Sequence, residues 1–171
     1  KLAVTGATTF KRNIVTITVA SDADNSTTLT EAQSGSIVTV NTAACASSGS
    51  DTTINLPGAS DTAGGTATPG LTYEIHIVGT PGHAAALINV STGHNDVNFA
   101  AYSYFIGAHA SADGVSICGT RAHSRLILTP ATPAESLDTV IKCTCLTTTL
   151  WRIECFEPAA AASNFTTQAA L

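Results

Sequence analysis

The feature that most constrains the fold is a succession of short runs rich in Val, Ile and Thr, separated by turn dipeptides. The dipeptides are Ser-Gly, Pro-Gly and Asp-Gly, and no segment longer than about ten residues places apolar residues at helical spacing. About ten such strands predict an all-β fold, an antiparallel β-sandwich or barrel of jelly-roll type, rather than alternating βαβ units. The runs lie at 13–19, 36–40, 52–56, 71–78, 86–90, 97–105, 115–120, 125–128, 139–146 and 150–156.

The last two runs predict a hairpin that turns around Thr148. In this register three thiols and the only Trp share one face, while opposite charges meet on the other face. A slip of one residue would break both patterns. The predicted pairs are Cys145 with Trp151, Cys143 with Ile153, and Lys142 with Glu154.

One short helical turn is expected at Thr30-Glu31-Ala32-Gln33, which has the form of a capping box. Gly35 follows and can adopt the left-handed conformation that ends such a turn.

The two ends differ from the middle in composition. We expect an N-terminal arm at 1–12, a single β domain at 13–157 and a low-complexity C-terminal arm at 158–171. The C-terminal arm has only Phe165 and Leu171 as large apolar groups, so its own core could not hold it. We therefore expect both arms to extend onto neighbouring subunits or partners. Phe165 and Leu171 would supply the apolar contacts, and Lys11 and Arg12 would face an acidic surface.

Composition excludes several functional classes. Charged residues make up 11% of the 171, less than half of the roughly 25% typical of soluble domains, and the net charge is −5. The seven Lys and Arg are scattered, which argues against nucleic-acid binding. The longest apolar runs have four or five residues, too few for a membrane-spanning helix. A surface of neutral hydroxyls and methyls is suited to packing against neighbours.

No motif in the sequence predicts catalysis, a metal or a cofactor. The five Cys are an odd number without metal-ligand spacing, and we expect all five to be reduced. The five His form no His-x-x-x-His or His-Glu pair, and Gly-x-Ser-x-Gly is absent. The sequence therefore predicts a protein that is not an enzyme.

Four segments within residues 27–78 carry a resemblance to a known family. They are Thr-Leu-Thr-Glu-Ala-Gln-Ser-Gly at 28–35, Ile-Val-Thr-Val at 37–40, Thr-Ile-Asn-Leu-Pro at 53–57 and Gly-Leu-Thr-Tyr-Glu-Ile at 70–75. This pattern resembles tailed-phage virion structural proteins of the capsid decoration (cement) and head-fibre type. The resemblance implies a β-rich, usually trimeric, non-enzymatic virion component. We expect a decoration protein on the outer surface of an icosahedral head, bound to the lattice of the major capsid protein as a homotrimer.

A fibre knob or lectin-like receptor-binding module is the alternative. It predicts an exposed aromatic platform at Tyr102 and Tyr104, or a calcium ion at Asp22 and Asp24.

Overall fold

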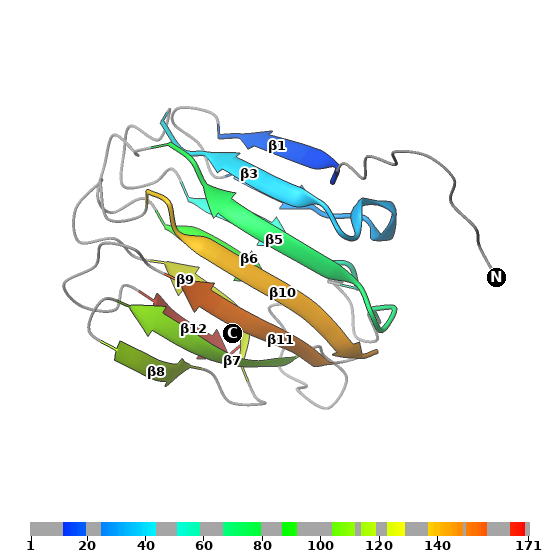
Figure 1. Ribbon diagram of the computed structural model, residues 1–171, viewed down its shortest axis with the longest axis vertical. Helices are drawn as coiled ribbons and strands as arrows, with labels where there is room; N and C mark the ends of the chain where they lie inside the picture. Colours follow the sequence, from blue (N-terminus) through cyan, green and yellow to red (C-terminus); the bar gives the residue numbers. More distant parts are fainter. Residues whose placement is uncertain are drawn as a thin grey trace, which may run out of the picture.

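In the computed structural model of the chain, strands make up nearly all of the regular structure (Figure 1). The structure describes residues 12–19, 25–43, 51–58, 67–79, 87–91, 104–111, 114–118, 123–128, 137–148, 150–156 and 165–169. The elements in this part are β1 (Ile14–Thr18), β2 (Asn25–Thr28), the 3₁₀ turn η1 (Glu31–Gln33), β3 (Ile37–Asn41), β4 (Thr52–Asn55), β5 (Thr72–Ile77), β6 (Ile88–Ser91), β7 (Tyr104–Ser111), β8 (Gly114–Cys118), β9 (His123–Leu128), β10 (Val140–Thr147), β11 (Leu150–Phe156) and β12 (Phe165–Ala169). Among these residues no helix is long and apolar enough to cross a membrane.

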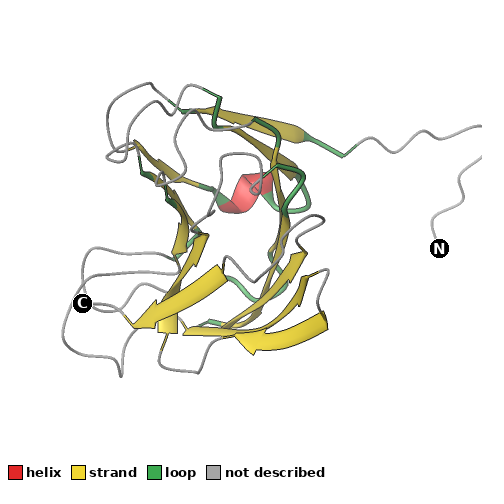
Figure 2. Ribbon diagram, turned by 90° about the vertical axis from the view of Figure 1, so that its left-hand side faces the viewer, coloured by secondary structure: helices red, strands yellow, loops and turns green. Residues whose placement is uncertain are grey.

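The strands form two sheets that face each other (Figure 2). Sheet A has the order β1-β3-β5-β10-β11-β7-β8, and sheet B has the order β12-β9-β6-β4-β2. The first six strands alternate between the two sheets, so each successive pair adds one strand to each sheet. Two neighbouring strands of one sheet are therefore separated along the chain by a strand of the other sheet. The pairing is parallel in both sets, β1, β3 and β5 in sheet A and β2, β4 and β6 in sheet B.

The predicted antiparallel β-sandwich or barrel of jelly-roll type is wrong. Both sheets are mixed and open, and half of the described strand pairings are parallel. The physical reason is that the period of two marks a strand but does not reveal the direction of its neighbour. The Pro-Gly turn after β4, for example, does not close a hairpin, because β5 lies in the other sheet.

The predicted hairpin is confirmed. Strands β10 and β11 pair antiparallel with Cys145 opposite Trp151, Cys143 opposite Ile153 and Lys142 opposite Glu154. The register shifts between Cys145 and Thr147, where the hairpin approaches its turn. Strand β10 also pairs antiparallel with β5, so the hairpin sits in the middle of sheet A.

The hydrophobic core lies between the two sheets and takes side chains from both. Ile75, Ile141 and Ile153 from sheet A, and Ile54 and Leu126 from sheet B, are almost completely buried. The sequence alternates apolar and polar residues along most strands, and the apolar half faces this core.

Two bulky aromatic side chains fill the end of the core near η1. The rings of Tyr73 and Trp151 lie with their centroids 6.1 Å apart, and the Tyr73 hydroxyl donates to the Thr30 carbonyl at 2.8 Å. Burial, followed by the charge of Glu31, raises the pKa of Tyr73 to about 12. The predicted turn is present as well: the Thr30 N–H donates to Gln33 Oε1 at 2.8 Å.

The predicted extended C-terminal arm is wrong for Phe165–Ala169, which forms β12. This strand pairs antiparallel with β9 at the edge of sheet B of its own chain, with Phe165 opposite Leu128. The sequence argument considered only large apolar side chains, whereas an edge strand is also held by backbone hydrogen bonds. The division of the chain at residues 12 and 157 stays a prediction.

Candidate interface on the outer face of sheet A

Several exposed apolar side chains of the described residues lie on the face of sheet A that points away from sheet B. The four large ones are Ile14, 62% exposed, Val78, 47% exposed, and Leu146 and Phe156, each 42% exposed. Each lies next to a residue that faces the core, so all four point outward from the same sheet. They do not form one contiguous patch, because Ile14 belongs to the edge strand β1, Val78 follows β5, and Leu146 and Phe156 belong to β10 and β11.

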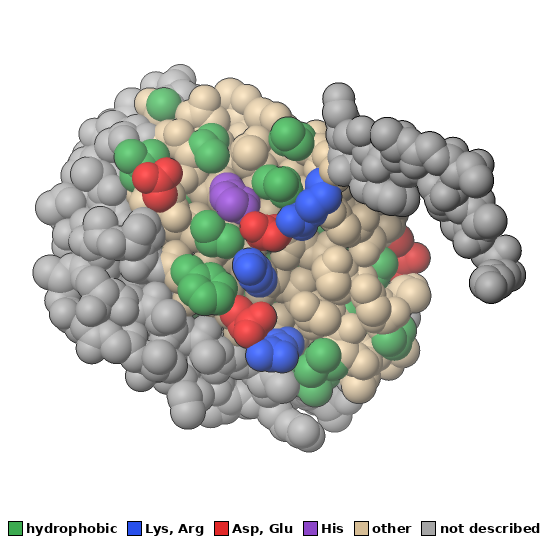
Figure 3. All heavy atoms as spheres, viewed as in Figure 1, with side chains coloured by type: hydrophobic (Ala, Val, Ile, Leu, Met, Phe, Trp, Pro, Cys, Tyr) green, Lys and Arg blue, Asp and Glu red, His purple; other side chains and the backbone are tan. Residues whose placement is uncertain are grey.

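A row of charges of alternating sign crosses the same face. In register, Lys142 of β10 lies opposite Glu74 of β5 on one side and opposite Glu154 of β11 on the other. Arg12 pairs with Glu74 and Arg152 with Glu154, each at 2.7 Å, which extends the row at both ends. Figure 3 shows this row of cations and carboxylates among the apolar groups. We call these five residues the charge row.

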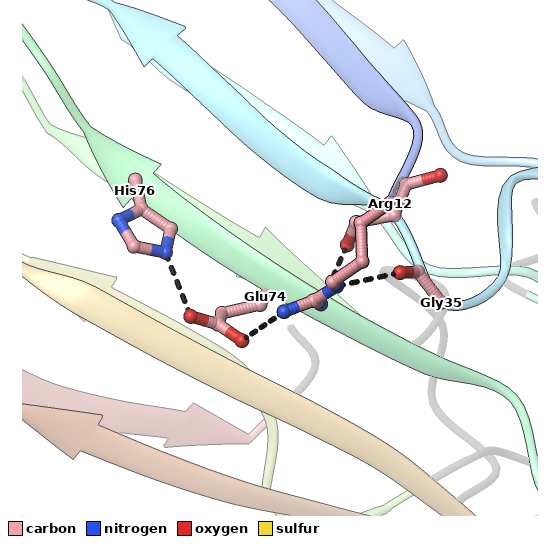
Figure 4. A network of polar contacts seen from close by, with 5 residues as sticks. Arg12, Gly35, Glu74 and His76 are labelled. Atoms are coloured by element: carbon pink, nitrogen blue, oxygen red, sulfur yellow. Dashed lines mark hydrogen bonds and ion pairs between the residues drawn. The ribbon is translucent and has the colours of Figure 1, made fainter. Parts of the chain in front are cut away.

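At one end of the charge row, Arg12 forms hydrogen bonds that connect the start of β1 to the start of β3 and to β5 (Figure 4). Its Nη1 donates to Glu74 Oε2 at 2.7 Å, and its Nε donates to the Gly35 carbonyl at 2.9 Å. A third, longer bond runs from Nη2 to the Ser36 carbonyl at 3.3 Å. His76 Nε2 lies 2.9 Å from the other carboxylate oxygen of Glu74.

These contacts give Glu74 a pH-dependent role in stability. Hydrogen bonds from Arg12 and then from His76 hold the pKa of the Glu74 carboxyl below its ordinary value of 4.5. The ionised form is therefore favoured in the folded state. Its stabilising contribution is present above pH 4.5 and is lost as the pH falls through the lowered pKa of the folded state.

We expect Glu74→Gln to reduce stability at neutral pH by less than about 1 kcal/mol, because the ion pair is partly solvated. The difference from the unsubstituted protein should shrink below pH 4.5, where the carboxyl of the unsubstituted protein also becomes protonated. Urea denaturation at a series of pH values measures both quantities. A difference that grows as the pH falls would contradict the role given to Glu74.

In the middle of the charge row, the cation Lys142 lies over an exposed aromatic ring. Lys142 Nζ lies 5.4 Å from the centroid of the Phe156 ring, within the range of a cation–π contact. Aromatic residues and Arg are enriched at protein–protein interfaces, whereas Lys and Glu are depleted. On this face Phe156, Arg12 and Arg152 belong to the enriched types, so they are the side chains that favour its use as a protein-binding surface.

The thiols of β10 and β11 face the opposite way, into the core. Cys143, Cys145 and Cys155 are buried and form no disulfide. Burial raises the pKa of the Cys143 and Cys145 thiols, and the Cys145 thiol donates to the Thr147 carbonyl at 3.0 Å. Among the described residues no group of three or more His, Cys, Asp or Glu side chains could hold a metal ion.

We expect these three thiols to resist alkylation in the native protein, because the thiolate is the reactive form and burial disfavours it. In urea under non-reducing conditions all five cysteines should react with iodoacetamide. Mass spectrometry of the alkylated peptides measures both states. Two or more native disulfides would overturn the prediction that all five are reduced.

Of the residues predicted to contact partners, only Arg12 has a described side chain, and it is engaged within its own chain. Lys11 and Leu171 lie outside the described residues, and Phe165 is described only as the first residue of β12. Their contact with a partner stays a prediction. The alternative receptor-binding residues Tyr102, Asp22 and Asp24 also lie outside, and Tyr104 is described only as the start of β7.

Sequence reasoning missed Glu74 and Phe156 as surface residues of interest. The available signal was the outward half of the period-two pattern, in which Leu146 and Phe156 occupy positions where polar residues are expected.

No family model, no curated protein and no solved structure matches this chain.

Proposed function

We propose that this chain is a non-enzymatic virion structural protein, a capsid decoration (cement) protein that binds the outside of an icosahedral phage head. The observation that carries the proposal is the outer face of sheet A, where four exposed apolar side chains surround the charge row. An open sheet face of this kind suits a broad protein partner. The resemblance of residues 27–78 to virion proteins and the scarcity of charge support the same assignment.

The partner is the assembled lattice of the major capsid protein. A subunit that binds only the assembled lattice adds its binding free energy to the stability of that lattice. A homotrimer, the state that the resemblance implies, fits local threefold positions, where each copy contacts an equivalent surface. No cofactor is needed for this function.

The described polar groups also favour binding over catalysis. The titratable side chains of the charge row lie on an open face, where Arg12 pairs with Glu74 and Arg152 with Glu154, while three thiols are enclosed in the core. Catalytic sites instead place perturbed titratable groups together in a concave pocket.

The proposal predicts that Phe156→Asp weakens binding to heads that lack this protein by about 2 kcal/mol, which corresponds to roughly 30-fold in affinity. Phe156 is exposed, so the variant should keep its fold. Thr28→Asp, an exposed position in sheet B, is the matched control and should bind normally. Co-sedimentation with the heads measures binding, and differential scanning calorimetry measures the heat resistance that the bound protein confers.

Two results would contradict the proposal. Heads that lack the protein would be as resistant to heat as complete heads, or Phe156→Asp and Thr28→Asp would bind equally well.

A further inference from the structure

Strand β1 forms one edge of sheet A, and among the described residues it pairs only with β3 (Figure 1). Its register with β3 is continuous over five residue pairs, from Ile14 opposite Ile37 to Thr18 opposite Asn41. The sequence of β1 is Ile-Val-Thr-Ile-Thr, so every residue is β-branched and none is charged. The strand therefore lacks the charges, prolines and bulges that keep edge strands from pairing with another chain.

The backbone groups that point to the open edge can be assigned. The Asn13 carbonyl accepts from the Ile37 N–H, and the Val19 N–H donates to the Asn41 carbonyl. Odd-numbered residues of this segment therefore direct their backbone groups toward β3. The N–H and C=O groups of Ile14, Thr16 and Thr18 point to the open edge, since these directions alternate along a strand.

The core is also incompletely covered at this edge. Val15 faces the core but is only partly buried, whereas Val38, its register partner in β3, is completely buried. Ile14 on the outer face is the most exposed of the large apolar side chains described. A further strand beside β1 would cover the exposed part of Val15.

We propose that β1 pairs antiparallel with β1 of a second copy of this chain, about a two-fold axis at Thr16. In this register Thr16 lies opposite Thr16 of the second copy, and Ile14 lies opposite Thr18. These are the residues with backbone groups at the open edge, so each pair can exchange two hydrogen bonds. Val15 lies opposite Ile17 on the core side, where each covers the other.

The sequence of β1 is suited to this self-pairing. On the core side the register places Val15 opposite Ile17, two apolar residues. On the outer face it places Thr16 opposite Thr16 and Ile14 opposite Thr18, so each outer pair contains at least one Thr. The strand has no charged residue, so the pairing brings no like charges together. A two-fold contact of this kind is isologous, so one surface patch serves both subunits.

The two-fold axis of an antiparallel strand pair is perpendicular to the sheet, so the outer faces of both sheets A point to the same side. The two copies of the candidate interface can then bind the same surface at the same time. This bivalent binding is stronger than the binding of one copy, although each copy makes the same contacts as before. This consequence rests on the proposed function, whereas the pairing itself does not. In a trimeric assembly the two-fold contact joins subunits of two trimers, because a two-fold axis cannot close a trimer.

Cysteine cross-linking of the purified protein tests the pairing. In a hydrogen-bonded antiparallel pair the Cα atoms lie about 5.5 Å apart, within the roughly 4.4–6.8 Å that a disulfide spans. Thr16→Cys should therefore give a covalent dimer under mild oxidation. Thr18→Cys is the matched control, because the two Thr18 positions lie about 15 Å apart in this register.

A second experiment fixes the register and does not depend on Thr16. Ile14→Cys and Thr18→Cys proteins should cross-link to each other when mixed, and neither should cross-link to itself. Thr16→Lys, which places two like charges on the axis, should reduce the mass in solution by half relative to the unsubstituted protein. Equal cross-linking of all variants, or none in the mixture, would overturn the pairing. Because the head is absent from these experiments, such a result would leave the proposed capsid function unaffected.

Discussion

Replacing Trp151 by alanine should lower the free energy of unfolding by about 3–5 kcal/mol, a large part of the stability of a domain this size. The side chain is completely buried in the middle of sheet A and packs against Tyr73. Its removal leaves a cavity that neighbouring strands cannot fill, since both neighbours of β11 in the sheet order, β10 and β7, are fixed by backbone pairing. Urea denaturation followed by circular dichroism measures the loss.

Two further variants separate the loss of the ring from other effects. Trp151→Phe keeps most of the buried volume and removes an indole N–H for which the described part of the chain offers no hydrogen-bond partner, so it should cost clearly less. Leu146→Ala on the outer face should change stability by less than about 0.5 kcal/mol. A Trp151→Ala loss as small as that of Leu146→Ala would show that the core is not centred on this hairpin.

Replacing Gly79 by alanine is the second large effect, with an expected loss of about 1–3 kcal/mol. An added Cβ would lie 2.3 Å from Asn41 Oδ1 and within 2.9 Å of the backbone nitrogens of Thr42 and Ala43. A backbone nitrogen cannot move aside by rotation of a side chain. The segment that follows β3 would therefore have to move away from the segment that follows β5. The Gly79 carbonyl also accepts a hydrogen bond from the buried Thr42 hydroxyl, which such a movement would break.

Gly35→Ala is the matched control for Gly79→Ala. Gly35 has a φ of +79° but no atom within 4 Å of an added Cβ, so only backbone strain of about 1–2 kcal/mol is expected. The melting temperatures of the two variants, compared by scanning calorimetry, measure the effect. A melting temperature of Gly79→Ala equal to that of the unsubstituted protein would contradict the close approach.

The register of the β10–β11 hairpin could be predicted as far as Cys145, because two independent patterns agree on it, whereas the shift between Cys145 and Thr147 could not. The three thiols and Trp151 alternate with outward residues that include all the charged ones, and Lys142 meets Glu154 only when Cys143 meets Ile153. The parallel pairing of β1, β3 and β5 could not be predicted in this way. These strands are far apart in the sequence, and a period of two is compatible with either strand direction.

The candidate interface was predictable only in part. Arg12 was identified from its charge, but its main partner Glu74 lies 62 positions away and is brought close by the parallel order of β1, β3 and β5. The outward direction of Phe156 follows from its alternation with Cys155, whereas its exposure depends on the absence of a covering layer, which one strand does not specify. Strand β12 was missed because a short edge strand has few large side chains to identify it.

The most direct test of the proposed function is electron cryomicroscopy of purified virions that contain this chain. The proposal predicts density for the two-sheet fold on the outer surface of the head, with Phe156 and the charge row of sheet A turned toward the major capsid protein. Density for this chain in the tail, inside the head shell, or with sheet A turned toward solvent would contradict it.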